Sequence, residues 1–132
     1  MPDYFTRAEA EALLPRLDPL LRELRDLRAE LRQVEERLGE LQARMRGNGH
    51  ALQGEFGQLR ATAGTLVQGI NERVRQIHAW GVLVKDIETG LVDFPARRGG
   101  QDVYLCWRLD EPGVAWWHTI EGGFAARQPL ED

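Results

Sequence analysis

Apolar residues recur at alternating spacings of three and four through the first part of the chain. They are Leu17, Leu20, Leu24, Leu27, Leu31, Val34, Leu38, Leu41 and Met45. This is a heptad seam, in which one apolar stripe of a helix faces one partner helix. Thr6 and Glu9 form the capping-box pattern T-x-x-E, so the helix is expected to begin there. The apolar phase continues past Pro15 and Pro19. It favours a kink near Pro15 over the alternative of a short helix followed by a long one.

A second helical pattern follows the stretch RGNGH, whose glycines predict that the first helix stops and the chain reverses near 46–50. Its apolar positions are Leu52, Phe56, Leu59, Ala63, Leu66, Ile70, Val74, Ile77 and Trp80. Four glycines interrupt the pattern, each costing about 1 kcal/mol relative to alanine, so this helix should be the looser one. Matching lengths predict an antiparallel, coiled-coil-like hairpin. The apolar stripes widen away from the tip, which predicts that the hairpin is rooted near Trp80 and that its tip projects outward.

Beyond residue 81 the pattern changes to short runs rich in valine and aromatic residues. The runs are VLVKDI, GLVDF, DVYLCWRL and VAWWHT, separated by ETG, PARRGGQ and DEPG. Such runs between glycine- and proline-containing segments are typical of strands and turns. They predict a four-strand antiparallel β-meander. The fold class is therefore α+β in a single domain over 1–132, with the hairpin in 1–80 and a β head with a C-terminal tail in 81–132.

The expected turns determine which residues face each other in this sheet. A turn at 88–90 would place Lys85 opposite Asp93, and a turn at 110–113 would place Trp107 opposite Trp116. Leu105 would then lie opposite His118. The other face would carry Tyr104, Cys106, Arg108 and Trp117.

The composition is that of a globular chain, with 132 residues of which 42% are hydrophobic and 29% charged. The net charge of −4 comes from residues 82–132, because residues 1–81 carry twelve arginines and twelve acidic residues. A nucleic-acid binder concentrates positive charge on one face or domain. Here the aromatic-rich part is acidic, and the one contrary feature is the basic loop RMRGNGH. We therefore expect no nucleic-acid partner.

The cellular compartment follows from three further features. One cysteine cannot form an internal disulfide, which favours a reducing compartment. The N-terminal stretch MPDYFTRAEAEALLP lacks the apolar segment of a signal peptide. No stretch of eighteen consecutive apolar residues occurs. We expect a cytoplasmic protein that does not enter a membrane.

Four long strings resemble DUF2203, a family of uncharacterised bacterial proteins. They are YFTRAEAEALLPRL at residues 4–17, GVLVKDIETGLVDFPA at 81–96, VYLCWRLDE at 103–111 and WHTIEGGFAARQPL at 117–130. The chain departs from the family pattern mainly in its glycine-rich second helix. The resemblance supports the α+β fold and implies no activity, cofactor or partner.

The lone cysteine, Cys106, lies in the middle of a predicted strand. A nucleophilic cysteine needs a histidine or a helix N-terminus to lower the pKa of its thiol. The register above turns His118 away from Cys106, so we interpret Cys106 as a small buried apolar residue.

The histidines, His50, His78 and His118, stand far apart. A metal site would need ligands gathered from across the fold, such as Asp86, Asp93 or Glu121. We expect no metal, no cofactor and no catalytic residue.

Charged residues within mostly apolar strands must be paired or exposed. One interpretation is a cross-strand Lys85–Asp93 ion pair, with Arg108 and Arg127 covering aromatic rings. The other is a polar pocket on one sheet face, walled by tryptophans, that binds a small anionic or polar ligand. The candidate residues of that pocket are Lys85, Asp86, Asp93, Trp107, Arg108, Trp116, His118 and Arg127.

Two functions follow from these features. The heptad regularity favours a non-enzymatic interaction or structural module that self-associates through its hairpin or a sheet face. The alternative is a small ligand-binding protein or enzyme with its site on the sheet face. A homodimer would cover the apolar sheet face that the hairpin root leaves open, with the tryptophan-bearing face as the expected interface. The projecting hairpin could also contact another protein.

Overall fold

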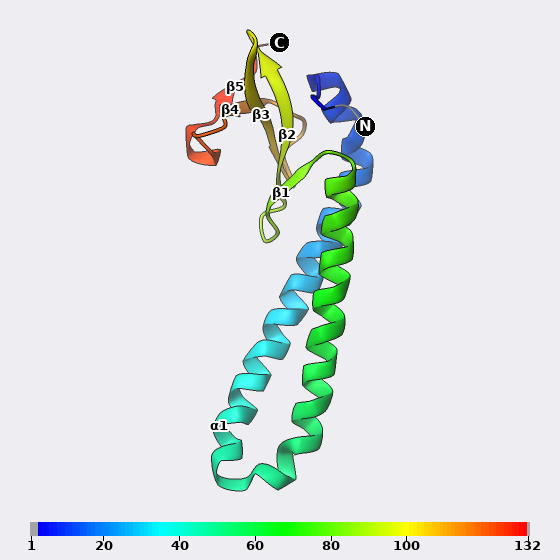
Figure 1. Cartoon of the computed structure of the whole chain (residues 1–132), viewed down its shortest axis with the longest axis vertical. Coiled ribbons are helices and arrows are strands. Elements are labelled where there is room, and N and C mark those ends of the chain that lie inside the picture. The colour runs from blue at the N-terminus through cyan, green and yellow to red at the C-terminus, as the bar shows by residue number, and fades with distance from the viewer. Residues whose placement is uncertain (1–2, 132) are drawn as a thin grey trace.

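A long helical hairpin carries a small sheet at one end (Figure 1). This computed structural model describes residues 3–131, except for the side chains of residues 48–51. Helix α1 spans Arg7–Ala79 and folds back on itself where its colour passes from cyan to green, which gives two limbs (Figure 1). The expected reversal near 46–50 is confirmed, but the expected helix stop is wrong, because the backbone stays helical through the glycines. The side chain of His50 lies outside the described residues.

The start of α1 is confirmed in detail. The Thr6 hydroxyl accepts a hydrogen bond from the Glu9 backbone N–H at 3.1 Å, and the Glu9 carboxylate accepts one from the Thr6 N–H at 2.9 Å. Pro15 and Pro19 both lie inside the helix, which continues without a break. The blue end of the ribbon bends away from the line of the limb, as a proline kink would require (Figure 1).

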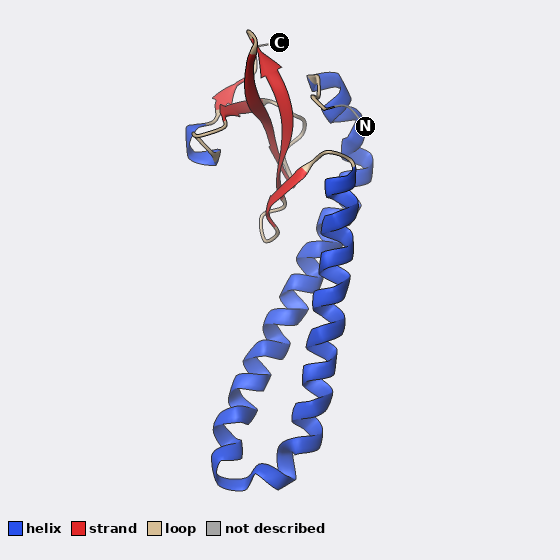
Figure 2. Ribbon diagram, viewed as in Figure 1, coloured by secondary structure: helices blue, strands red, loops and turns tan. Residues whose placement is uncertain are grey.

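The sheet is antiparallel, and its strands lie side by side in chain order (Figure 2). They are β1 (Leu83–Asp86), β2 (Leu91–Arg98), β3 (Gln101–Arg108), β4 (Trp116–Thr119) and β5 (Gln128–Pro129), with the 3-10 helix η1 (Phe124–Ala126) before β5. The meander is confirmed, but it has five strands rather than four. The fifth pairs through two residues only, one of them a proline, so no alternating pattern marks it in the sequence.

The expected register is wrong at the first turn. Asp93 pairs with Leu83 and not with Lys85. An irregularity between Val84 and Asp86 adds one residue to β1. Such a bulge shifts the facing of every residue beyond it.

The register is also wrong between β3 and β4. Cys106 pairs with Trp116, and Tyr104 pairs with His118. The connection spans residues 109–115 instead of a tight turn at 110–113, and Glu111 shapes it. The Glu111 carbonyl accepts a hydrogen bond from Trp107 Nε1 at 3.1 Å, and its carboxylate accepts one from the Arg108 N–H at 2.9 Å. A register slip of one residue places every side chain of β4 on the face of the sheet opposite to the one expected.

One face of the sheet packs on the root of the hairpin. The ring of Phe94 is fully buried and meets the edge of Phe5 at a centroid distance of 5.3 Å. Trp107, 2% exposed, belongs to the same core. The hairpin contributes Leu17, Leu21, Leu24 and Ile77 to this core. The expected root near Trp80 is therefore confirmed.

Two ion pairs also tie loops of the sheet to the first limb. Arg22 lies 3.3 Å from Asp110, and Arg32 pairs with Glu88. Contact with the head thus extends along α1 as far as Arg32. Among the described residues, no helix combines the length and the apolar character needed to cross a bilayer.

Candidate functional site

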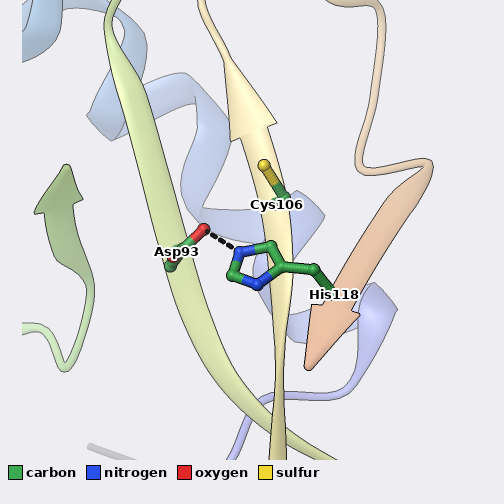
Figure 3. Close-up of side chains that lie close together, drawn as sticks. All are labelled: Asp93, Cys106 and His118. Atoms are coloured by element: carbon green, nitrogen blue, oxygen red, sulfur yellow. Dashed lines mark hydrogen bonds and ion pairs between the residues drawn. The ribbon is translucent and has the colours of Figure 1, made fainter. Parts of the chain in front are cut away.

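Three chemically different side chains meet on the sheet face that points away from α1 (Figure 3). Asp93 comes from β2, Cys106 from β3 and His118 from β4. Asp93 pairs directly with Cys106, and His118 lies two residues beyond Trp116, the other partner of Cys106. A carboxylate oxygen, the thiol sulfur and an imidazole nitrogen lie within 4.8 Å of one another. We call these three residues the Asp–Cys–His cluster.

The cluster is buried although its members are polar. Asp93 and His118 are each 3% exposed, and Cys106 is 0% exposed. His118 Nε2 lies 3.1 Å from Asp93 Oδ1 (Figure 3), and His118 Nδ1 lies 2.7 Å from the carbonyl oxygen of Thr119. A carbonyl oxygen only accepts, so Nδ1 carries a proton and donates it. The contact between Nε2 and Asp93 therefore needs a second proton, held by the imidazole or by the carboxyl group.

The Cys106 thiol is held in its protonated form. Its pKa is raised to about 12, chiefly by burial; the positive charge of Arg127 lowers it, and the negative charges of Asp93 and Glu111 raise it. A thiolate nucleophile requires the opposite arrangement, in which the pKa is lowered. In addition, both ring nitrogens of His118 already have partners. The cluster is therefore not an activated nucleophile–base pair.

Arg127 covers the aromatic side of this face. Its guanidinium lies 4.7 Å from the ring centroid of Trp116 and 4.6 Å from that of Phe124. Nη2 of Arg127 donates to both carboxylate oxygens of Glu111 at 3.0 Å, and the side chain is 12% exposed. Arg108 lies 5.4 Å from the Phe124 ring. The expectation that Arg108 and Arg127 cover aromatic rings is confirmed.

Lys85 and Asp86 lie outside the cluster. The Lys85 ammonium lies 5.3 Å from the centroid of the Tyr104 ring, and Asp93 is bonded to His118 instead. The predicted Lys85–Asp93 ion pair is therefore wrong, because the turn and the β1 bulge each shift the register by one residue and place Leu83 opposite Asp93. The Asp86 carboxylate accepts a hydrogen bond from Thr89 Oγ1 at 2.8 Å, which stabilises the turn.

The two tryptophans predicted to wall one pocket lie on opposite faces. Trp107 faces the core, whereas Trp116 lies on the face of the cluster, beneath Arg127. A hollow of about 150 Å³ on that face is lined by Asp86, Thr89, Leu91, Arg108 and Phe124. Of the predicted site residues, the structure thus brings together Asp93 and His118, and it places Trp116 and Arg127 beside them.

Sequence reasoning missed Cys106 as the neighbour of His118. The only signal was the register between β3 and β4, and the stretch DEPG reads equally well as a tight turn or as part of a longer connection. That choice changes the register by one residue and so decides which face of the sheet each side chain of β4 occupies. It therefore also decides whether the Cys106 thiol and the His118 imidazole meet.

Comparison with known proteins agrees with the resemblance seen in the sequence. A family model described as Uncharacterized conserved protein (DUF2203) matches residues 3–130. The match covers both limbs of α1, the sheet and the Asp–Cys–His cluster. No curated protein and no solved structure matches the chain.

Proposed function

The chain belongs to the uncharacterised DUF2203 family, and we propose that it is a non-enzymatic interaction module that pairs with a second copy of itself through its helical hairpin. The proposal rests on one observation, the change in burial of the apolar seam along α1. Near the sheet, the seam residues Leu17 and Leu24 are fully buried and Leu31 is 6% exposed, while Leu20 and Leu27 between them are half-buried.

The seam is less completely covered in residues 33–67, which we call the outer arm. Apart from Leu41 and Leu66, its apolar side chains are half-buried or exposed wherever the structure describes them. The half-buried ones include Val34, Leu38, Phe56 and Leu59. Val67, beside the seam on the second limb, is 43% exposed. A layer of two helices covers each apolar stripe from one side only, and a second hairpin would cover the remaining side as in a four-helix bundle.

The hairpin is a better candidate interface than the tryptophan-bearing sheet face. Trp107 already packs against α1, and Trp116 lies under Arg127. Trp117 is half-buried, with Arg98 over its ring at 4.8 Å. These contacts within one chain already cover the apolar sheet residues that a dimer through the sheet was expected to cover. A two-fold interface through the outer arm would let the same stripe of each copy cover the other.

The test is the mass of the full chain in solution. We expect twice the chain mass of 15.0 kDa in sedimentation or light-scattering measurements at tens of micromolar. Val67→Glu places a charge on an exposed side chain, so the helix should persist while the dimer dissociates at least tenfold more readily. Thr65→Glu, exposed on the opposite side of the same helical turn, should leave the dimer intact. A monomeric wild-type protein at these concentrations would refute the proposal.

A second candidate function is the binding of a small polar ligand beside β1. A hollow of about 420 Å³ between the hairpin and β1 is lined by Arg28, Val74, Val84, Lys85, Asp86, Ile87 and Glu88. Two of the predicted ligand-binding residues, Lys85 and Asp86, contribute to it. A thermal-shift screen of metabolites tests this function, because a ligand at a hundred times its Kd stabilises the fold by about 2.7 kcal/mol. Loss of such a shift in Lys85→Gln would locate the ligand there.

A further inference from the structure

We propose that the Asp–Cys–His cluster binds one divalent metal ion of borderline-soft character, for which Zn²⁺ is the best match. The ligands are the carboxylate of Asp93, the sulfur of Cys106 and Nε2 of His118. This site is independent of the association proposed above, because it lies in the sheet and not in the outer arm.

The donor atoms are already close to the separations that a metal requires. Zinc bonds of roughly 2.0 Å to nitrogen and oxygen and 2.3 Å to sulfur place tetrahedral ligand atoms about 3.5 Å apart. Asp93 Oδ1 and His118 Nε2 are 3.1 Å apart, and all three donor atoms lie within 4.8 Å. Side-chain rotations that move the donor atoms by about an ångström would bring all three to the separations of a tetrahedral zinc site. Since three adjacent strands supply the ligands, the backbone need not move.

The imidazole of His118 is oriented as in a metal ligand. A histidine that binds a metal through one nitrogen typically donates the other N–H to a carbonyl or carboxylate, which fixes the tautomer and the ring plane. His118 Nδ1 donates in this way to the Thr119 carbonyl at 2.7 Å. Nε2 is therefore the nitrogen available to a metal, and it points at Asp93 (Figure 3).

Charge balance suits an ion at this depth. A thiolate and a carboxylate together carry two negative charges, so a divalent cation gives a neutral buried site and avoids an unpaired buried charge. Arg127, whose positive charge acts on Cys106, is neutralised by Glu111 at 3.0 Å. Lys85 is exposed and lies over Tyr104. Neither side chain therefore places an unpaired positive charge against the ion.

The donor set selects the class of metal. Sulfur and imidazole nitrogen favour zinc and its spectroscopic substitute Co²⁺ over Mg²⁺ and Ca²⁺, which prefer oxygen ligands alone. Three protein ligands leave one tetrahedral position for water. Binding replaces the proton on Cys106 Sγ and the proton shared by Asp93 and His118, and both pass to the buffer. The exchange is one M²⁺ for two H⁺.

The experiment uses the full chain after removal of metal with a chelator. Titration with Co²⁺ should give one equivalent of a tetrahedral visible spectrum with a thiolate-to-cobalt charge-transfer band, which Zn²⁺ then abolishes. Cys106 is the only cysteine in the chain, so the charge-transfer band can arise from this residue alone. Calorimetry in two buffers of different ionisation enthalpy should give about two protons released per ion.

Three variants test the individual ligands. Cys106→Ser should abolish the charge-transfer band, and Asp93→Asn and His118→Gln should each weaken binding by at least tenfold. His78→Gln is the matched control, since His78 is exposed and outside the cluster, and it should bind as the wild type does. Near-UV circular dichroism of the metal-free proteins shows whether each variant is folded.

The wild-type titration alone can overturn the proposal, whatever the variants do. Absence of a charge-transfer band, or release of fewer than one proton, would show that the cluster does not bind the ion. Binding that survives Cys106→Ser with an unchanged spectrum would place the metal elsewhere. A monomeric protein that still shows the band would remove the association proposal and leave this one standing.

Discussion

Burial governs the chemistry of Cys106 more strongly than any neighbouring charge. It is the largest cause of the raised thiol pKa of about 12, and Arg127 opposes it only in part. In the unfolded chain the same thiol is solvated and has its ordinary pKa of 9.0. In mildly alkaline solution, folding therefore keeps a proton on Cys106 that the unfolded chain releases.

This difference predicts a pH-dependent loss of stability. Above the unfolded pKa the unfolded state binds fewer protons than the native state, so the free energy of unfolding falls as the pH rises from about 9 to about 12. The slope is at most about 1.4 kcal/mol per pH unit. In urea unfolding of the metal-free protein at pH 8 and pH 10, the wild type should lose about 1 kcal/mol more than Cys106→Ala. All other ionisable groups are common to both proteins, so their contributions cancel in the comparison. Equal losses would contradict the prediction.

At the scale of residues, the sequence identified Asp93 and His118 as candidate site residues. It did not predict that they lie beside Cys106. Asp93 and His118 stand out because polar groups within apolar strands need partners. Asp93 meets Cys106 through the register between β2 and β3, and His118 joins them because the connection at 109–115 shifts β4 by one residue from the expected register. Neither leaves a mark in the hydrophobic pattern.

At the scale of elements, the second limb of α1 carries glycines with unequal surroundings. A methyl group added to Gly64 would contact nothing within 4 Å. One added to Gly69 would lie 3.6 Å from Leu27 Cδ1 and 3.4 Å from Arg73 Nη1. Gly64 therefore lowers the stability of the helix only through its poor helix propensity. Gly69 lies beside side chains that pack between the two limbs.

We predict that Gly64→Ala raises the free energy of unfolding by about 0.5–1 kcal/mol, because alanine loses less backbone entropy in a helix. Gly69→Ala should gain at least as much, since its methyl group would also make van der Waals contact with Leu27 and Arg73. Urea unfolding followed by circular dichroism at equal protein concentrations compares the two. A less stable Gly64→Ala protein would show that this face of the helix is already in contact with something.

The helical elements were predictable because their signals are long and redundant. Nine seam positions and a capping box all point to the same helix, so one conflicting signal at Pro15 does not overturn the pattern. The sheet rests on runs of four to eight residues. For these the strand type is evident, but the register and a two-residue edge strand are not.

At the scale of the whole molecule, the head and the outer arm are stabilised by different contacts. The core combines the sheet with the root of α1, and among the described side chains the ion pair between hairpin and head that lies furthest along the first limb is Arg32–Glu88. Beyond it the two limbs contact each other, for example through Arg37 and Glu55 at 2.9 Å.

We therefore predict that the outer arm is dispensable for folding. Deleting residues 33–43 together with the facing 52–62 removes about three turns from each limb and preserves the helical phase. The shortened protein should still unfold cooperatively and keep the near-UV circular dichroism of its tryptophans, whereas its mass should fall to that of a monomer. A non-cooperative transition, with dye binding typical of a molten globule, would show instead that the arm belongs to the core.

The order of the strands has a consequence for how the molecule folds. Each strand pairs with the one that precedes or follows it in the chain, and the two limbs of α1 are likewise joined by a short reversal. Closing such short loops costs little entropy, so both halves can assemble quickly from local contacts. The contacts between the hairpin and the sheet are non-local, and one of them is the hydrogen bond from the Phe5 N–H to the Pro95 carbonyl at 2.7 Å, which joins the segment before α1 to β2. That bond must wait until β2 exists, so the segment that precedes α1 is among the last to be fixed in place.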